Sequence, residues 1–313
     1  MTEYLPPKVS VIIPSYNHER YVEESIRSVL EQTYENIEII VLDDGSSDSS
    51  PEILKKLSEQ YGFYYEHQNN IGLPATLNKA IKIASGDFIS FVASDDVFLP
   101  DKIQLLMDAF KELNEEYAVV CGDAYFIDND SGYISREKNG KQFNTAVNFY
   151  IDGKKDFSLK DKFGVYESFL SSNYIPILST LIKKKALVEV GLYEENIHLE
   201  DLNMWFKLSK KHRFHYIDVP VAKYRWHGNN SIITLNKKMM SDLLKILNRE
   251  RNYCEKEGLT EKWESAYFSK IFFFSKSFDL KIVLENLTLR DMPIFFRYLL
   301  LKIHFTLKAS WGK

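Results

Sequence analysis

Short apolar runs alternate with amphipathic segments along the first third of the chain. The run Val9–Pro14 is apolar and β-branched apart from one serine, which is typical of a buried strand. In the segment that follows, Val22, Ile26 and Val29 recur at the spacing of one helical face. The alternation predicts further strands at 37–44, 63–67, 87–96 and 117–122, and helices at 19–34, 50–61, 73–85 and 100–113. Strands and helices in this alternation predict an α/β fold, with a mostly parallel sheet and helices on both faces.

The pattern loosens in the middle of the chain. Residues 123–160 are polar and weakly periodic, with many Asn, Asp, Gly and Lys residues, and this predicts a loop-rich insertion. Ordered segments are expected again at 174–184, followed by a helix at 199–211 and two strands at 213–218 and 221–227. After Asn229 the pattern is helical to the end.

Composition narrows the class of protein. With 313 residues, 45% of them hydrophobic and 27% charged, the chain has the make-up of a soluble globular protein with a substantial core. A net charge of −4 gives no global attraction to nucleic acid, so no nucleic-acid partner is expected. Cys121 and Cys254 have no metal-ligand spacing and predict reduced thiols in the cytoplasm. We expect neither a signal peptide nor a membrane-spanning helix.

Two of the expected strands end in a pair of adjacent carboxylates. Asp43 and Asp44 close the strand at 37–44, and Asp95 and Asp96 close the strand at 87–96. In open α/β sheets, ligands bind beyond the carboxyl ends of the strands. A carboxylate pair there can bind a nucleotide base or ribose, or hold a hard divalent cation. One pair alone is equally typical of a turn followed by a helix N-cap, but two pairs in the same context favour a binding site.

The order of motifs resembles that of the family 2 glycosyltransferases, which are inverting enzymes with the GT-A fold. The resemblance lies in "VSVIIPSYNHERYVEESIRSVLEQTYENIEIIVLDDGSSDSS", "NNIGLPATLNKAIKIASGDFISFVASDD", "HLEDLNMWFKL" and "YRWHGNNS", and spans about residues 8–231. It implies a GT-A-type, Rossmann-like catalytic domain at 1–231 and a helical C-terminal extension at 232–313. Within the domain, the nucleotide-binding half is expected at about 8–122 and the acceptor half at about 160–231.

The resemblance also implies a reaction. A sugar passes from a nucleotide diphosphate sugar to a hydroxyl of a glycan acceptor, in the biosynthesis of a bacterial polysaccharide, O-antigen or capsule. The enzyme is then a hexosyl-, N-acetylhexosaminyl- or rhamnosyltransferase. A catalytically silent relative, which binds a nucleotide or an assembly partner, stays open as the alternative.

Donor-binding roles follow position by position from the resemblance. Pro14 and Tyr16 are expected to line the nucleobase pocket, Asp44 to accept a hydrogen bond from the base, and Asp43 to lie near the ribose. Asp95 is expected to contact the ribose or donor sugar. Asp96 matches the position that binds Mg²⁺ or Mn²⁺, which would stabilise the departing nucleoside diphosphate.

The later motifs supply the remaining expected roles. By themselves, Glu200 and Asp201 are an ordinary acidic first turn of a helix, favoured by the helix dipole. The resemblance implies instead that Asp201 is the general base and that Glu200 shapes the acceptor site. His227 is expected as a further metal or phosphate ligand, and Arg225 as a partner of the diphosphate. Many relatives carry an arginine where this chain has Thr76-Leu77, which puts a phosphate contact from that helix in doubt.

Two other α/β classes lack their motifs here. A phosphorylated receiver domain needs its acid pair after the first strand, and a nicotinamide-dependent oxidoreductase needs a glycine-rich G-x-G-x-x-G segment there. Residues 14–17, Pro-Ser-Tyr-Asn, occupy that place instead.

The end of the chain is basic and aromatic. Residues 290–313 contain five Lys or Arg residues and one acid, within an apolar background that is typical of a helix lying on anionic lipid. A polyprenyl-diphosphate-linked acceptor would give such docking a purpose, at the inner face of the cytoplasmic membrane. Packing of these helices on the catalytic domain, or on a second copy of the chain as a homodimer, is the alternative.

Overall fold

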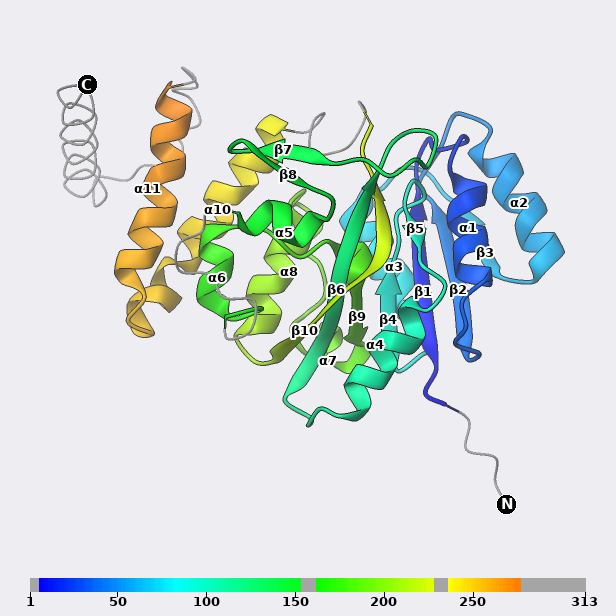
Figure 1. The fold of residues 1–313 in the computed structure, drawn as a ribbon, viewed down its shortest axis with the longest axis horizontal. Coiled ribbons are helices and arrows are strands. Elements are labelled where there is room, and N and C mark those ends of the chain that lie inside the picture. Colours follow the sequence, from blue (N-terminus) through cyan, green and yellow to red (C-terminus); the bar gives the residue numbers. More distant parts are fainter. Residues whose placement is uncertain (1–5, 153–161, 228–235, 277–313) are drawn as a thin grey trace. The chain divides into compact units, whose positions relative to one another are not determined.

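The computed structural model describes residues 6–152, 162–227 and 236–276 (Figure 1). The chain divides into two compact units, Met1–Ile233 and Thr234–Lys313. The first unit contains an eight-stranded sheet with the strand order β3-β2-β1-β4-β9-β6-β10-β5. The expected basic tail at 290–313, and with it the membrane and homodimer hypotheses, lies outside the described residues.

Parallel pairing organises the N-terminal half of the sheet. Strand β1 lies between β2 and β4 and is parallel to both, and β2 is parallel to β3. The strands are β1 (Val9–Ser15), β2 (Ile37–Asp43), β3 (Tyr64–His67) and β4 (Phe88–Phe91). Every residue of β1 is buried except Pro14, which is partly exposed, because helices cover the sheet on both sides. This half follows the predicted alternation closely.

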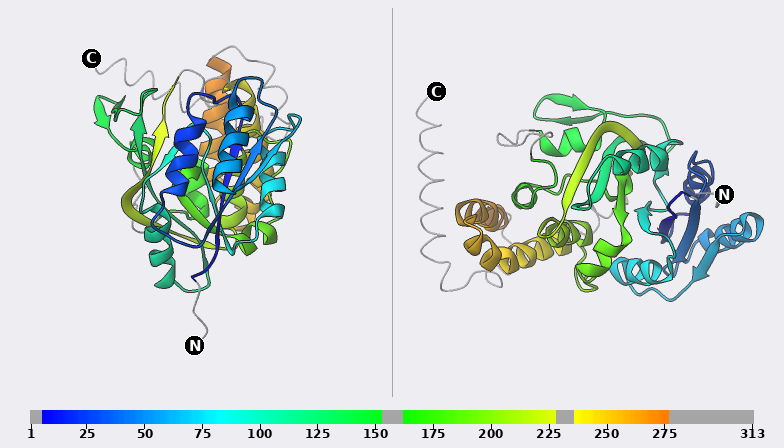
Figure 2. Two further views of the ribbon diagram at one scale, coloured as in Figure 1. Left: turned by 90° about the vertical axis from the view of Figure 1, so that its right-hand side faces the viewer. Right: turned by 90° about the horizontal axis from the view of Figure 1, so that it is seen from below.

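Three helices share one hydrophobic core with a single face of this sheet. The side chains of Val9, Val11 and Ile13 point into that core, which also receives the apolar faces of the three helices. These helices are α1 (Val22–Leu30), α2 (Ser50–Tyr61) and α4 (Lys102–Lys111). Helices α1 and α2 lie side by side and face the viewer in the left view of Figure 2. A fourth helix, α3 (Leu73–Ile83), packs against β1 and β2 from the other face.

The second half of the sheet contains the two strands that run against the rest. Strand β9 (Thr180–Lys183) is antiparallel to β4 and to β6 (Tyr117–Ile127). Strand β6 is parallel to β10 (Arg213–Arg225), and the short β5 (Val97–Phe98) closes the edge antiparallel to β10. The sheet is therefore mostly parallel, as predicted.

Strand β10 corrects one prediction. Two strands were expected at 213–218 and 221–227, but one long strand pairs with β6 throughout. Its register shifts on both sides of Pro220. Proline has no N–H to donate to the ladder, so a bulge at this point lets the strand continue past it.

The expected loop-rich insertion is another correction. Strand β6 continues to Ile127, and the chain then forms the hairpin of β7 (Arg136–Lys138) and β8 (Lys141–Phe143), followed by helix α5 (Ala146–Ile151). Asn139 and Gly140 form the hairpin turn with φ of 53° and 73°. Two successive residues in the left-handed region are the geometry of a type I′ turn, for which Asn-Gly is the preferred pair.

The C-terminal part of the first unit packs short helices against the sheet. Helix α6 (Tyr166–Ser171) packs on α8 (Glu200–Ser209), whose Trp205 is fully buried. Just before α6, Gly164 has φ of +67°, and a Cβ built there would lie 2.1 Å from the Cβ of Phe214 on β10. The backbone approaches β10 this closely only because the residue is glycine. The connection from α6 to α8 contains a 3₁₀ turn (Ile177–Ser179) and α7 (Lys184–Glu189).

The second unit contains helices α10 (Asn236–Lys256) and α11 (Thr260–Lys276), which pack on each other. Trp263 is buried, and its Nε1 donates a hydrogen bond to the carbonyl of Leu247 at 2.5 Å. Within the described ranges, none of the helices combines the length and the apolar character needed to cross a bilayer.

Candidate active site

The site lies beyond the carboxyl ends of the parallel strands. Ser15 pairs with Asp43 at the ends of β1 and β2, and the segment after β4 carries Asp95 and Asp96. Parallel strands bring their carboxyl ends to the same edge, so the two acid pairs and the segment after β1 meet there. Tyr16 is 50% exposed at this edge, and its ring is open to a ligand.

The first acid pair is held by neighbouring loops. Asp43 is fully buried and accepts hydrogen bonds from the amide and hydroxyl of Ser46 and from Nδ1 of His67. Asp44 accepts bonds of 2.9 Å from Nε2 of Gln68 and from the amides of Ile71 and Gly72. Asp44 thus ties the end of β2 to the loop that precedes α3.

Two histidines and one carboxylate of the second acid pair form a compact cluster. His18, Asp95 and His227 each offer one ligand atom, and these atoms lie within 4.8 Å of one another. Nε2 of His227 lies 2.9 Å from Oδ2 of Asp95, and Nε2 of His18 lies 3.7 Å from the same oxygen. Ser94 contacts the other ring nitrogen of His18, Nδ1, at 2.8 Å and so orients Nε2 toward Asp95.

The cluster suits a divalent cation. Burial acts to raise the pKa of Asp95, but the hydrogen bond from His227 and the nearby His18 outweigh it and lower that pKa. The carboxylate is therefore ionised and opposes two imidazole nitrogens, which bind first-row transition ions well when neutral. His18 was not among the residues expected from the sequence. Its only local signal is its place three residues after the first strand.

Asp96 lies next to this cluster but faces another group. Its Oδ1 accepts a hydrogen bond of 2.8 Å from the amide of Arg225, and burial together with the charge of Asp95 raises its pKa well above the ordinary value. Among the described residues, Asp95 is the carboxylate that joins the two histidines. The sequence had led us to expect Asp96 in that position and Asp95 at the ribose or sugar.

Arg225 has a different surrounding from the one expected. The side chain is fully buried, with Nε donating to the carbonyl of Asp95 at 2.7 Å and Nη2 donating to Glu24 at 2.5 Å. Nη1 donates to the carbonyl of Asp128 at 2.7 Å and to the hydroxyl of Ser131 at 3.1 Å. The guanidinium fork expected for a diphosphate is thus bonded to the protein, where it joins the loop after β6 to α1.

A third pair of carboxylates, Glu200 and Asp201, begins helix α8. Asp201 accepts a bond of 2.8 Å from Nδ2 of Asn173 and one of 2.7 Å from the amide of Leu202. Burial raises the pKa of Asp201, against the opposing effect of Asn173. Burial and the adjacent Asp201 raise the pKa of Glu200 to about 8. Asn173 had no sequence signal, since its contact with Asp201 spans 28 residues.

Two tyrosines lie near both the Asp95–Asp96 pair, which follows β4, and the Glu200–Asp201 pair, which begins α8. Burial raises the pKa of Tyr150 to about 12, and the charges of Asp201 and Asp96 act on it in the same direction. Burial also raises the pKa of Tyr224 well above its ordinary value, and Asp96, Asp95 and Asp201 add to the effect. Both phenols therefore lie near both carboxylate pairs. The Glu200–Asp201 pair therefore lies in the neighbourhood of Asp95 and Asp96.

Comparison with known proteins identifies the family. A family model described as glycosyl transferase family 2 matches residues 10–171, just over half of the chain. The chain belongs to this family. An uncharacterized glycosyltransferase of Rickettsia typhi is 30% identical over 90% of this chain and 85% of its own length. An uncharacterized glycosyltransferase of Rickettsia bellii is 31% identical over 78% of this chain, but the match covers 34% of that protein.

Two solved structures share the fold. Residues 1–349 of S. aureus TarS, in complex with UDP-GlcNAc, match with a TM-score of 0.59 at 20% identity, over 93% of this chain and 79% of that one. The mannosyltransferase PcManGT from Pyrobaculum calidifontis, in complex with GDP-Man and Mn²⁺, matches with a TM-score of 0.58 at 14% identity, over 96% and 81%. The fold is of the GT-A type. Both the family and this fold, which the motif order predicted, are confirmed.

Proposed function

We propose that this glycosyltransferase moves a sugar, with inversion, from a nucleotide diphosphate sugar to a hydroxyl of a glycan acceptor. One observation carries the proposal: Tyr150 and Tyr224 lie near both the Asp95–Asp96 pair and the Glu200–Asp201 pair, so the His18–Asp95–His227 cluster and the candidate base are neighbours. An inverting displacement needs a base on the acceptor side and cationic groups on the leaving-group side. The Glu200–Asp201 pair provides the base, and the His18–Asp95–His227 cluster would hold the cation.

Asp201 is the proposed general base. Its oxygens each accept one hydrogen bond from the protein, which leaves further lone pairs for the acceptor hydroxyl. The hydroxyl proton passes to Asp201 as the acceptor oxygen bonds to the anomeric carbon, and the bond from that carbon to the diphosphate breaks. A carboxylate whose pKa is raised by burial holds this proton more strongly than an exposed one. Glu200, beside it, is proposed to shape the acceptor site.

His18, Asp95 and His227 are the proposed ligands of a divalent cation, with Asp96 beside them. A bound cation would stabilise the negative charge of the departing nucleoside diphosphate. Two imidazoles and one carboxylate favour Mn²⁺ over Mg²⁺, which prefers oxygen ligands. On the nucleoside side, Asp43, Asp44, Pro14 and Tyr16 are proposed to bind the base and ribose, with the exposed ring of Tyr16 against the base.

A thermal-shift screen tests the proposal. Sugars of UDP, GDP and dTDP are added to the protein with Mn²⁺ or with EDTA, because a ligand that binds only the native state raises the melting temperature. We expect one nucleotide class to stabilise the protein with Mn²⁺ and much less with EDTA. His18→Ala should remove the effect of Mn²⁺, whereas the control His215→Ala, at the other end of β10, should retain it. Absence of any nucleotide effect would refute the proposed function.

A further inference from the structure

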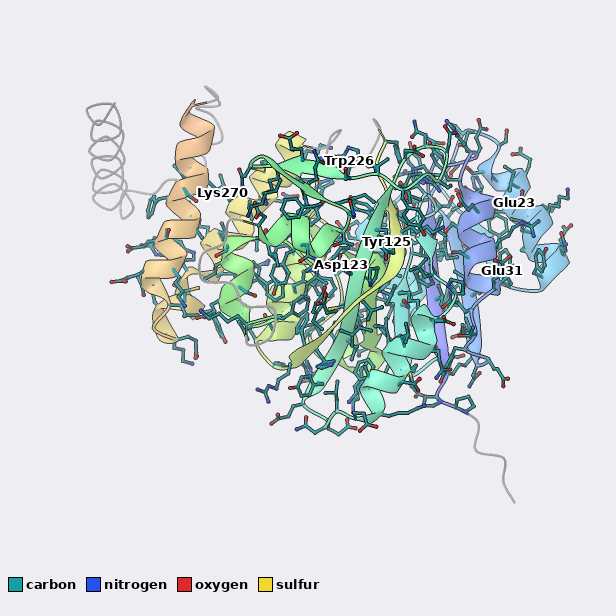
Figure 3. All side chains as sticks on the ribbon, in the orientation of Figure 1. Glu23, Glu31, Asp123, Tyr125, Trp226 and Lys270 are labelled. Atoms are coloured by element: carbon teal, nitrogen blue, oxygen red, sulfur yellow. The ribbon has the colours of Figure 1, made fainter. Side chains whose placement is uncertain are left out.

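Arg136 lies on the hairpin beside the site and is held there by aromatic rings. Its guanidinium carbon lies 3.3 Å from the ring centroid of Trp226, 4.6 Å from that of Phe149 and 5.5 Å from that of Phe126. Figure 3 labels Trp226 beside β7. The hairpin is fastened to α5, because Nζ of Lys138 donates to the carbonyl of Phe149 at 2.7 Å. The position of the guanidinium is therefore set by packing on two sides.

The same guanidinium has no polar partner among the described residues. Each of the other arginines in the described ranges forms an ion pair with a carboxylate: Arg20, Arg27, Arg213, Arg225, Arg249 and Arg251. Arg136 is partly buried, and that burial lowers its pKa, yet no carboxylate faces it within the described chain. A charge kept partly out of water without a counter-ion is costly; the aromatic rings offset part of this cost, and an anionic ligand would offset more of it.

Arg136 also lies close to the reacting groups. Tyr150 and Tyr224, the two tyrosines between the acid pairs, both act on the pKa of Arg136. Its stacking partner Trp226 directly precedes His227 of the metal-compatible cluster. The guanidinium carbon lies over the rings of Trp226 and Phe149, and its five N–H donors have no polar partner among the described residues. The free edge of the guanidinium suits two oxygens of one phosphate group.

We propose that Arg136 is a phosphate-binding residue of this site, held face-on by Trp226 and Phe149 so that its free edge binds phosphate oxygens of a substrate. The inference rests on the proposed function and deepens it. The phosphate belongs either to the diphosphate of the donor or to a phosphate carried by the acceptor, and the recognition chemistry is the same for both. Arg136 thus takes the part that the sequence had suggested for Arg225.

Calorimetry with three variants tests the assignment. UDP, GDP and dTDP with Mn²⁺ are titrated into the full chain, into Arg136→Ala, into Arg136→Lys and into the control Arg213→Ala. Arg213 also stacks on an aromatic ring, that of Tyr117, but lies at the start of β10. In a second arm, inorganic phosphate and glycerol phosphate are titrated in the presence of the saturating nucleotide. Circular dichroism and Mn²⁺ affinity check that each variant keeps the fold and the cluster.

Each outcome decides between sources or overturns the proposal. If Arg136→Ala binds nucleoside diphosphate about 10- to 100-fold more weakly than wild type, and Arg136→Lys loses less, then Arg136 binds the diphosphate of the donor. Unchanged nucleotide affinity with lost phosphate binding in the second arm assigns the acceptor phosphate. A wild-type chain that binds nucleotide, with a folded Arg136→Ala that equals it in both arms, refutes the role of Arg136 alone. A wild-type chain that binds none of the three nucleotides refutes the proposed function and the inference with it.

Discussion

Asp95 and Asp201 belong to neighbouring carboxylate pairs, yet their surroundings shift the pKa values of the two carboxylates in opposite directions. Two histidines lower the pKa of Asp95 in spite of its burial, whereas burial raises the pKa of Asp201. An ionised carboxylate suits a cation, and a more basic one suits proton transfer. The division of labour between the acid pairs therefore depends on what each residue contacts.

Replacing Asp201 by Asn tests the base. The amide keeps the shape of the side chain but cannot take the acceptor proton, so turnover should fall about 10²- to 10⁴-fold. Affinity for the donor nucleotide should stay within about twofold in calorimetry, because a base that acts on the acceptor in the transition state contributes little to donor binding. Asp218→Asn, on the exposed side of β10, is the matched control and should behave as wild type. If Asp201→Asn keeps most of its turnover, the base is Glu200 or another group.

Glu200 should make the protein less stable as the pH rises. Burial and the adjacent Asp201 raise its pKa in the folded state to about 8, whereas the unfolded chain releases this proton near the ordinary glutamate pKa of 4.5. Between these values the folded state binds more protons, so the free energy of unfolding decreases with increasing pH. Glu200→Gln removes this term. Urea unfolding at pH 5.5 and at pH 8 measures how far the free energy of unfolding falls between these two pH values. We expect this fall to be smaller for Glu200→Gln than for wild type, by at least about 1 kcal/mol.

The exposed Glu195→Gln provides the comparison for this pH effect. It also replaces one carboxyl by an amide, but at an exposed position, so its stability should follow the wild-type pH profile. Parallel profiles for all three proteins would show that Glu200 does not hold its proton in the folded state.

The family resemblance names most of the candidate site residues, but several of their contacts could not be predicted from the sequence. Asp95 and His227 lie at motif positions, and the structure brings their side chains together. His18 and Asn173 act through side chains distant in sequence, and nothing local distinguishes them from other polar loop residues. Arg225 and Arg136 are both arginines, and only the three-dimensional packing shows that the guanidinium of Arg225 is the one hydrogen-bonded to the protein.

Elements were easiest to predict where burial controls the pattern. Strands β1, β2 and β4 are covered on both faces, and their apolar runs were evident. The hairpin of β7 and β8 was missed because its residues are largely polar and partly exposed, although Asn139-Gly140 carried a turn signal. Strand β9 lies between β4 and β6 and runs antiparallel to both. Neither its place nor its direction could be predicted, because the sequence of a strand does not specify which strands it pairs with.

Gly164 should be the most sensitive glycine of the connection into α6. Alanine there would adopt a left-handed φ and bring its Cβ within 2.1 Å of the Cβ of Phe214. Gly164→Ala should therefore have a lower free energy of unfolding than wild type. Backbone strain contributes about 1 kcal/mol to the loss, and the steric clash contributes about 1–3 kcal/mol. Gly140→Ala has a similar φ of +73° with no atom within 4 Å, so it should lose only the first part. Equal losses in urea unfolding would contradict the close approach to β10.

At the scale of the whole molecule, the sheet joins segments that are distant in the chain. Strand β6, eleven residues long and almost entirely buried, lies between β9 and β10. Both partners come later in the sequence, at Thr180–Lys183 and Arg213–Arg225. The parallel half from β1 to β4, in contrast, finds all its internal pairings within the first 91 residues.

This order has a consequence for synthesis on the ribosome. About a hundred residues separate the end of β6 from the end of β10, which at about 5–20 residues per second leaves β6 without its β10 partner for roughly 5–20 s. An apolar strand with an open edge is a site for chaperone binding or aggregation during that time. Nascent chains stalled at residue 130 plus the length of the exit tunnel, which expose β6, should therefore bind a general chaperone more strongly than chains stalled at residue 230 plus the same length, which also expose β10. Equal chaperone binding at both lengths would mean that β6 is protected before its partners emerge. The half of the sheet that carries the first acid pair can fold early, whereas the completed site has to wait for β10.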